Sequence, residues 1–379
     1  MASPSHADPY AQAGVDTAAG DRAVELMKAS IKRTHGPEVL GGVGGFAGMF
    51  DASALLGFTR PLLASSTDGV GTKVAIAQAI DTHDTVGHDL VGMVVDDIVV
   101  VGARPLFMTD YIACGKLVPE RIASLVGGIA EACALTGTAL VGGETAEHPG
   151  LLGPNDYDLA GAATGVVEAD RMLGAERVRD GDVVLALGSS GLHSNGYSLV
   201  RHIVANAGLS YGDLAADFGT TWGEALLTPT RLYTTPLLEV IDAVRQPGLP
   251  AAEAEGIHAL THVTGGGIAA NLARVLPAGS WVELDRSTWS PAAVFRVLAE
   301  AGGLELSDTE GTWNLGIGFL AVVAPSVADQ VTAALSERGI PTWQAGLVRQ
   351  AGRPEGAFVE GAKGVDGGAV RLVGSYAAA

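Results

Sequence analysis

Four times along this chain, a short apolar run ends in glycines mixed with hydroxyl or acidic residues. The resulting loops cover residues 65–73, 142–147, 189–196 and 263–267. An apolar run bounded by glycines is typical of a buried strand that ends in a tight loop. Because segments with helical periodicity separate these runs, the sequence predicts an α/β protein of the α+β type. We expect the loops to contribute to one ligand site.

The first loop has the residue types that a phosphate and its metal ion need. Gly69 and Gly71 allow a sharp turn that brings backbone N–H groups near an anion, and Lys73 adds a compact positive charge. Asp68 would repel a phosphate, so its expected partner is a divalent cation that the phosphate also binds. The loop is not a Walker A motif, because its lysine follows Gly-Thr. An ordinary turn with a surface aspartate and lysine is the alternative for this stretch alone.

Further carboxylates follow in the first half of the chain. An apolar helix predicted over 88–103 is interrupted by Asp96 and Asp97, and later segments carry Asp110 on a predicted strand and Glu144 on a predicted loop. A buried carboxylate needs a partner or a metal ion. Adjacent helix residues point about 100° apart, so only one of the two aspartates is expected to face a given site. The alternative is that one lies at a helix edge and the other bonds to backbone N–H groups.

A charged, turn-rich stretch at 170–181 predicts a domain boundary. The predicted parts are an N-terminal arm (1–20), a first domain (21–174) and a second α/β domain (175–379). In the second domain, small neighbours leave His193 room to reach a ligand, and the helix that follows favours an anion nearby. A solvated loop histidine is the alternative.

The composition limits the kinds of molecule that this protein is expected to bind. The net charge of −19 argues against nonspecific nucleic-acid binding, which needs basic surface. The two cysteines, Cys114 and Cys133, are too few for a disulfide framework and fit a reducing compartment. Residues 1–10 do not have the basic region followed by an apolar stretch that is typical of a leader peptide, and no apolar run reaches membrane-spanning length. We therefore expect a cytoplasmic protein with no nucleic-acid and no membrane partner.

Together the motifs resemble those of the phosphoribosylformylglycinamidine cyclo-ligase family, also called aminoimidazole ribonucleotide synthetases, of de novo purine synthesis. The matching segments are Asp-Gly-Val-Gly-Thr-Lys at 68–73, Val-Gly-Gly-Glu-Thr-Ala-Glu at 141–147, Leu-Gly-Ser-Ser-Gly-Leu-His-Ser-Asn-Gly-Tyr-Ser at 187–198, Thr-Gly-Gly-Gly at 264–267, and an N-terminal signature at Tyr10, 13–16, 37–42 and 44–46. The sequence departs from the family's usual residues at Asp96 (often Asn), His148 (often Met), Leu192 (often Pro) and Trp313 (often Phe).

The resemblance implies two α/β domains, with the N-terminal sheet pairing with that of a second subunit to form a barrel, and a C-terminal sheet flanked by helices. It therefore implies a homodimer, in which the first domain (21–174) binds ATP and dimerises. It also implies formylglycinamidine ribonucleotide as substrate, with ATP and Mg²⁺. ATP would phosphorylate the formyl amide oxygen, and phosphate would leave when the amidine nitrogen closes the ring. Such a transfer requires mainly positioning and charge neutralisation.

The resemblance also assigns roles to residues. It implies magnesium ligands at Asp68, Asp97 and Glu144, and catalytic roles for Lys73, His193 and Asp110. His193 would polarise the amide or move a proton. ATP and its phosphates are expected to contact Thr67, Asp68, Gly69, Val70, Gly71, Thr72 and Lys73. Substrate contacts are expected from Gly142, Gly143, Thr145, Ser189, Ser190, Gly191, Ser194, Asn195, Thr264, Gly265, Gly266, Gly267 and Asn314.

Other functions remain open at this point. Thiamine-phosphate kinase, selenophosphate synthetase and a hydrogenase-maturation protein belong to the same superfamily. Selenophosphate synthetase usually carries a reactive cysteine near its glycine loop, and the stretch before Asp68 has none. A scaffold protein without turnover would be expected to lose some acidic residues or Lys73, and all of them are present.

Overall fold

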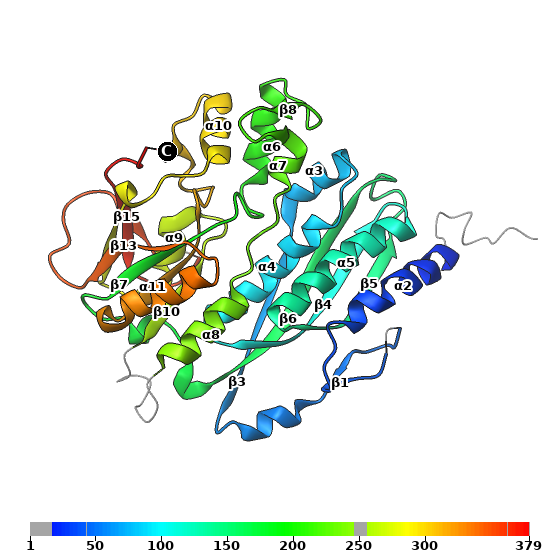
Figure 1. Cartoon of the computed structure of the whole chain (residues 1–379), viewed down its shortest axis with the longest axis horizontal. Helices are drawn as coiled ribbons and strands as arrows, with labels where there is room; N and C mark the ends of the chain where they lie inside the picture. Colours follow the sequence, from blue (N-terminus) through cyan, green and yellow to red (C-terminus); the bar gives the residue numbers. More distant parts are fainter. Residues whose placement is uncertain (1–16, 43, 246–255, 362, 379) are drawn as a thin grey trace, which may run out of the picture.

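The structure is a computed structural model that describes residues 17–42, 44–245, 256–361 and 363–378 of the 379-residue chain. Two sheets, each packed with helices, lie side by side (Figure 1). The first part ends with β6 (Tyr157–Glu168) and the second begins with β7 (Val183–Gly188). The predicted domain boundary lies between these two strands, and the predicted α/β class is confirmed.

The N-terminal part is built on a four-stranded sheet with the order β3-β6-β4-β5. Neighbouring strands are antiparallel except β4 and β5, which are parallel. Besides β6, the strands are β3 (Pro61–Gly69), β4 (Arg104–Cys114) and β5 (Ala139–Glu147). The sequence predicts a loop over 142–147, and this is wrong, because β5 continues through these residues. Small loops before this sheet carry the short strands β1 (Val39–Leu40) and β2 (Met49–Phe50).

Helices cover one face of this sheet. They are α2 (Thr17–Lys32), α3 (Val74–Ala79), α4 (Thr85–Val99) and α5 (Pro119–Thr136), and α4 and α5 lie over the strands in Figure 1. Side chains of β4 alternate, so Met108 and Ile112 are buried under the helices while Thr109 and Tyr111 point to the other face. That face leaves the side chains of Leu63 and Tyr111 exposed.

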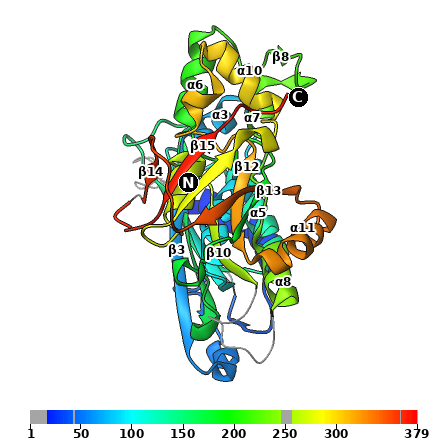
Figure 2. The same ribbon diagram turned by 90° about the vertical axis from the view of Figure 1, so that its left-hand side faces the viewer.

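The C-terminal part is built on a seven-stranded sheet with the order β10-β12-β7-β13-β11-β15-β14. Figure 2 shows its strands from the left-hand side of Figure 1, with α6 and α10 above them and α8 and α11 to one side. Besides β7, the strands of this sheet are β10 (Ile257–His262), β11 (Trp281–Asp285), β12 (Ile317–Val323), β13 (Thr342–Arg349), β14 (Val359–Glu360) and β15 (Ala369–Val373). A separate two-stranded sheet consists of β8 (Leu214–Ala215) and β9 (Thr220–Thr221). The helices are α6 (Tyr197–Asn206), α7 (Trp222–Leu226), α8 (Thr234–Val244), α9 (Gly267–Ala273), α10 (Ala293–Gly302) and α11 (Ala328–Glu337).

Two buried carboxylates of α4 fasten the two parts together. Asp89 accepts hydrogen bonds from the N–H and the hydroxyl of Thr230 at 2.9 and 2.6 Å. Two helical turns later, Asp96 accepts from the N–H of Tyr233 at 3.1 Å and from the N–H and hydroxyl of Thr234 at 2.9 and 2.6 Å. Because α8 begins at Thr234, Asp96 satisfies N–H groups that the helix itself leaves free.

Element boundaries differ from the predicted ones where tertiary contacts intervene. The predicted N-terminal arm (1–20) overlaps α2, which begins at Thr17, and residues 1–16 lie outside the described residues. The helix predicted over 88–103 corresponds to α4, which spans Thr85–Val99, and α8 begins only at Thr234 because the residues before it bond to α4.

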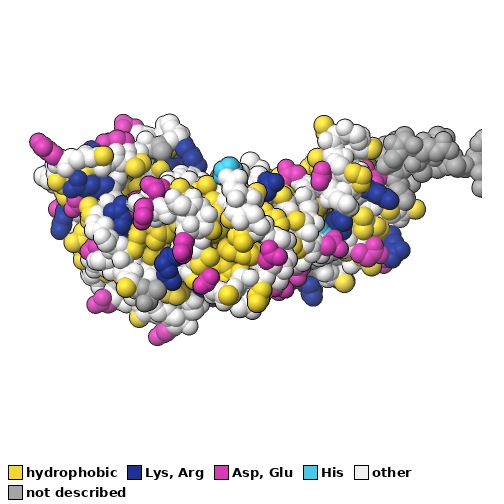
Figure 3. Space-filling model, turned by 90° about the horizontal axis from the view of Figure 1, so that it is seen from above, with side chains coloured by type: hydrophobic (Ala, Val, Ile, Leu, Met, Phe, Trp, Pro, Cys, Tyr) yellow, Lys and Arg dark blue, Asp and Glu magenta, His cyan; other side chains and the backbone are white. Residues whose placement is uncertain are grey.

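The surface agrees with the acidic composition. Figure 3 shows Asp and Glu side chains spread over both parts of the upper face, with Lys and Arg side chains among them. Among the described residues, none of the helices combines the length and the apolar character that crossing a membrane requires.

Candidate functional site

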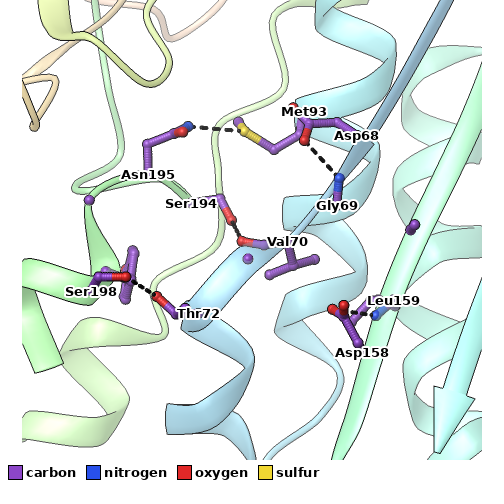
Figure 4. A pocket seen from close by; sticks show the side chains of 14 residues that line it. Asp68, Gly69, Val70, Thr72, Met93, Asp158, Leu159, Ser194, Asn195 and Ser198 are labelled. Carbon is purple, nitrogen blue, oxygen red and sulfur yellow. Dashed lines mark hydrogen bonds between the residues drawn. The ribbon is translucent and has the colours of Figure 1, made fainter.

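A cleft of about 430 Å³ lies where the two parts meet (Figure 4). The end of β3, the 3-10 helix η2 (Gly71–Lys73), α4 and the start of β6 form one wall. The loop before α6 and the first turn of α6 form the other wall. The lining residues are Asp68, Gly69, Val70, Gly71, Thr72, Met93, Asp158, Leu159, Ala160, Ser194, Asn195, Gly196, Tyr197 and Ser198.

Hydrogen bonds join the predicted phosphate loop to the facing loop of the second part. The Ser194 hydroxyl donates to the carbonyl of Val70 at 2.6 Å, and the hydroxyls of Thr72 and Ser198 lie 3.2 Å apart. Gly71 has a φ of 72°, a left-handed conformation that glycine adopts without steric cost. The structure thus brings predicted nucleotide-binding residues 68–72 to the cleft. Thr67 does not line it, since its hydroxyl donates to the carbonyl of Gly161 at 2.9 Å.

Lys73 is fully buried and does not line the cleft. Its ammonium donates to Asp89 at 2.8 Å and to the carbonyls of His193 and Thr228 at 2.9 and 2.8 Å. An ammonium has three N–H donors, so all of them are used within the protein. Burial lowers the pKa of Lys73, and the Asp89 charge opposes that shift. In this conformation Lys73 has no donor left for a phosphate.

His193 also lies behind the cleft wall rather than in it. Its side chain is 1% exposed, its backbone is left-handed with a φ of 61°, and its ring packs on Tyr233 at 6.0 Å. The N–H of Ser190 donates to Nε2 at 3.2 Å, which leaves the ring proton on Nδ1. Burial, followed by the nearby charges of His262 and Lys73, holds the pKa of His193 well below its usual range. The imidazole is therefore neutral.

Asp68 and Asp97 form an acidic pair beside the cleft. Asp68 accepts a hydrogen bond from the Gly69 N–H at 2.7 Å, and Asp97 accepts one from Nδ1 of His262 at 3.0 Å. Burial raises the pKa of Asp68, and the negative charge of Asp97 adds to that rise, while the Gly69 N–H opposes it. Mutual repulsion of this kind is relieved by a cation. His262, in turn, stacks on Phe319 with the ring centroids 5.1 Å apart.

Glu144 lies far from this pair within one chain. β3 and β5 are the two edges of the four-stranded sheet, so three spacings of about 4.8 Å, or about 14 Å, separate them. Glu144 is paired with Tyr111, whose side chain belongs to the open face. The described part of the chain contains no group of three or more His, Cys, Asp or Glu side chains that could hold a metal ion. The predicted convergence of Asp68, Asp97 and Glu144 does not occur within a single chain.

Asp110 faces the helices on the covered side of β4. Its Oδ1 lies 1.8 Å from the point where a Cβ on Gly143 would stand, so glycine is required there, and Oδ2 is buried without a hydrogen-bond partner. Burial raises the pKa of Asp110 to about 7. The pKa of Cys133 on α5 is raised by burial and then by Asp110. Asp110, Gly142, Gly143 and Thr145 are not among the residues that line the cleft.

The residues predicted to bind substrate in the 189–196 loop hold one another. The Ser189 hydroxyl and the Asn314 amide both donate to the carbonyl of Gly191 at 2.9 Å. The Ser190 hydroxyl donates to the carbonyl of Pro229 at 2.6 Å. These bonds bring Ser189, Gly191 and Asn314 together, and they fix the backbone that leads to the cleft residue Ser194.

The 264–267 loop contacts the cleft through Asn195. A Cβ on Gly265 would stand 3.6 Å from Oδ1 of Asn195, and the Asn195 amide donates to the sulfur of Met93 at 3.2 Å. Gly266 and Gly267 have φ values of 104° and 74°. The Thr264 carbonyl accepts from the Asn271 amide at 3.1 Å. The loop therefore forms a support immediately behind the second wall.

Sequence reasoning did not identify Met93, Asp158, Ser198 or His262 as site residues. Asp158 is the second residue of β6, and the Gly-Pro-Asn-Asp turn before that strand did not mark it as a site residue. His262 could have been found from its position, because it ends a buried strand directly before the Thr-Gly-Gly-Gly loop. Met93 and Ser198 enter only through the contact between the two parts.

The matching family model and the most similar curated proteins indicate the same family for this chain. The family described as "AIR synthase related protein" matches through its N-terminal domain over residues 50–167 and its C-terminal domain over residues 179–358. The phosphoribosylformylglycinamidine cyclo-ligase of Geobacillus kaustophilus is 47% identical over 343 residues, covering 90% of this chain and 96% of that protein. The cyclo-ligase of Xanthomonas oryzae pv. oryzae is 45% identical over 339 residues, covering 89% and 96%.

Solved structures with low sequence identity share the fold. HypE from E. coli is 19% identical with a TM-score of 0.61, covering 95% of this chain and 94% of that chain. The thiamine-monophosphate kinase of Stenotrophomonas maltophilia is 18% identical with a TM-score of 0.60, covering 93% and 96%. The high identity to the curated relatives extends through both parts of the structure. This chain therefore belongs to the phosphoribosylformylglycinamidine cyclo-ligase family.

Proposed function

We propose that this chain catalyses the ATP-dependent ring closure of formylglycinamidine ribonucleotide to 5-aminoimidazole ribonucleotide, with release of ADP and phosphate, in de novo purine synthesis. The observation that carries this proposal is identity of 45–47% over about nine-tenths of the chain to proteins named for the reaction. The alternative, a thiamine-phosphate kinase, rests only on a shared fold at 18% identity.

The cleft is the site where we place the nucleotide. Backbone N–H groups of the 69–72 loop lie in its wall, and such groups bind phosphate oxygens. Phosphorylation of the amide oxygen turns it into a leaving group, after which the amidine nitrogen attacks the carbon. In this proposal the loops at 189–196 and 264–267 hold the substrate. A HypE with the same fold has been solved in complex with ATP, at 19% identity and a TM-score of 0.56.

Magnesium fits the acidic pair. Mg²⁺ is commonly held by one or two carboxylates, with water and substrate phosphates completing its shell. Asp68 and Asp97 supply two carboxylates whose mutual repulsion a cation would relieve. We therefore propose these two as ligands, and bound Mg²⁺ would neutralise phosphate charge during transfer. Glu144 could join them only from a second subunit.

Lys73 and His193 fit supporting roles better than direct contact with phosphate or the amide. The Lys73 ammonium bonds to the His193 carbonyl, and this bond holds the loop that carries Ser194 and Asn195. A neutral, buried His193 is suited to orienting this loop. For Asp110 we propose a role in shaping the sheet in place of the predicted catalytic role, since its carboxyl packs on Gly143.

We also propose a homodimer formed through the open face of the four-stranded sheet. Leu63 and Tyr111 are 63% and 42% exposed on this face. Exposed apolar side chains on an uncovered sheet face are typical of an interface.

The two cysteines are buried and unpaired, which supports the predicted cytoplasmic location.

One assay tests the function. The protein is incubated with ATP, Mg²⁺ and formylglycinamidine ribonucleotide, and 5-aminoimidazole ribonucleotide and ADP are measured, with thiamine phosphate as the competing substrate. Asp68→Asn should lose most turnover at any Mg²⁺ concentration while its urea unfolding midpoint stays unchanged. Asp84→Asn, which alters an exposed aspartate without a cap hydrogen bond, is the matched control. Absence of the imidazole product from the wild-type protein would refute the proposal.

A further inference from the structure

A side-chain cluster outside the cleft connects residues 374–377 to the 264–267 loop. We call it the brace and define it as Arg286, Glu310 and Tyr376. These residues come from three distant parts of the chain, and Tyr376 lies beyond the segment that matches the family's C-terminal domain. None of the three belongs to the cleft lining.

Glu310 is the centre of the brace. Its carboxylate accepts from Nε and Nη2 of Arg286 at 2.7 and 2.9 Å, a two-bond geometry that fixes the carboxylate plane. The Tyr376 hydroxyl donates to the same carboxylate at 2.7 Å. The Arg286 and Glu310 side chains are 18% and 17% exposed, so the ion pair is largely shielded from water.

The segment beyond β15 is held in place by the same arginine. Nη1 of Arg286 donates to the carbonyls of Leu372 and Gly374 at 2.9 and 3.2 Å. The Tyr376 ring packs edge-on against Trp289 at 5.3 Å, and the Ala377 N–H donates to the Trp289 carbonyl at 3.1 Å. The segment is therefore an ordered part of the fold.

The backbone of Glu310 touches the glycine loop directly. A Cβ on Gly267 would stand 1.7 Å from the Glu310 carbonyl oxygen and 3.1 Å from the Cα of Gly311. With a φ of 74°, Gly267 turns the chain into α9 against this surface. On the other side of the same loop, Gly265 faces Asn195, a residue of the cleft wall.

The stretch after Glu310 supports the other loop as well. The ring of Trp313 occupies the space beside Gly196, where a Cβ would stand 2.5 Å from Cδ1 of the indole. Asn314 donates to Gly191, and Trp289 donates from its indole N–H to the carbonyl of Leu315 at 3.0 Å. Both loops thus rest on one segment, which the brace anchors.

We propose that residues 374–377 set the position of the substrate loops, with Tyr376 as a positioning residue that acts through Glu310. This inference rests on the proposed function for the identity of the substrate, but the mechanical link does not depend on it. The nucleotide contacts that we propose for the 68–72 loop lie outside the brace, and no brace residue bonds to that loop. Loss of the brace is therefore expected to weaken binding of the ribonucleotide substrate and to leave ATP binding unchanged.

Tyr376→Phe removes one hydroxyl and retains the ring. Loss of the net contribution of one typical hydrogen bond predicts a rise of about three- to tenfold in KM for formylglycinamidine ribonucleotide. KM for ATP should stay at the wild-type value, and the melting temperature should fall by no more than about 2–4 °C, the change expected for one lost hydrogen bond. Tyr211→Phe, in the connection between α6 and α7, is the control for removing a half-buried tyrosine hydroxyl.

Hydrogen exchange supplies a readout that does not need turnover. Amides of residues 264–268 should exchange faster in Tyr376→Phe than in the wild type, while those of β3 keep their rates. A chain ending at Val373 should show both effects more strongly. The proposal is overturned if exchange in this loop is unchanged in both variants, or if KM for ATP rises as much as KM for the ribonucleotide. If the wild type makes no imidazole product, the exchange result alone decides.

Discussion

The buried ion pair between Lys73 and Asp89 provides a direct test of what this lysine does. Lys73→Met keeps the length of the side chain but removes the charge and all three donors. Asp89 then stays buried with only its bonds to Thr230, and the carbonyls of His193 and Thr228 lose their donor. Removing one partner of a buried pair costs about 3–5 kcal/mol, because the remaining charge is left uncompensated.

The assay is equilibrium unfolding in urea, followed by tryptophan fluorescence. We expect the midpoint to fall by an amount equivalent to about 3–5 kcal/mol with the slope unchanged. The double variant Lys73→Met/Asp89→Asn should lose less than the single variant, since the amide removes the unpaired charge and can still accept from Thr230. Lys28→Met is the control: Lys28 and its partner Glu25 are 50% and 72% exposed, and such pairs contribute about 0–1 kcal/mol.

A small effect on stability would refute the structural role. If Lys73→Met unfolded at the same midpoint as Lys28→Met and had lost ATP affinity, the lysine would have to leave its buried position to reach a phosphate. The same result would restore the interpretation that the Asp-Gly-Val-Gly-Thr-Lys motif suggests from residue types alone.

Three other perturbations follow from the geometry. Asp110 keeps its proton up to about pH 7 in the folded state and loses it near its ordinary value of 3.8 when unfolded, so wild-type stability should fall as pH rises through this window. Asp110→Asn should flatten that dependence by up to about 4 kcal/mol in urea unfolding. Because burial depresses its pKa, His193 should remain neutral at pH 6 in an NMR titration, and a charged ring would contradict its described surroundings. Gly267→Ala, which meets a carbonyl oxygen, should cost about 1–3 kcal/mol more than Gly279→Ala, which has a similar φ and open space.

Much of the fold follows from local patterns. The apolar runs before the glycine loops predicted the buried strands β7 and β10, and the apolar segment at 88–103 predicted α4. The alternative that one of two adjacent aspartates bonds to backbone N–H groups holds for Asp96. Glycine-rich stretches were less informative, since Gly142 and Gly143 belong to a strand that packs on Asp110.

The geometry of the site could not be predicted from local sequence patterns. Whether Asp68 and Glu144 approach each other depends on the order of strands in the sheet, which places β3 and β5 at opposite edges. The direction of Lys73 depends on the short helix η2, which turns the ammonium into the contact between the two parts. Sequence motifs therefore predicted two of the segments that line the cleft, but they could not assign a task to every side chain in the four loops.

The cleft lies between the two parts of the chain, and this explains why Lys73, a charged residue of a motif, holds the two parts together. A site between two domains exists only while the domains keep one relative position, and here the fixing bonds come from the same segments that line the cleft. Ser194 bonds to Val70, and Lys73 bonds to the His193 carbonyl. Because these bonds cross the contact, a substitution that weakens them should change cleft geometry and stability together. Kinetic defects in such variants can therefore be assigned to lost ligand contacts only after unfolding has been measured.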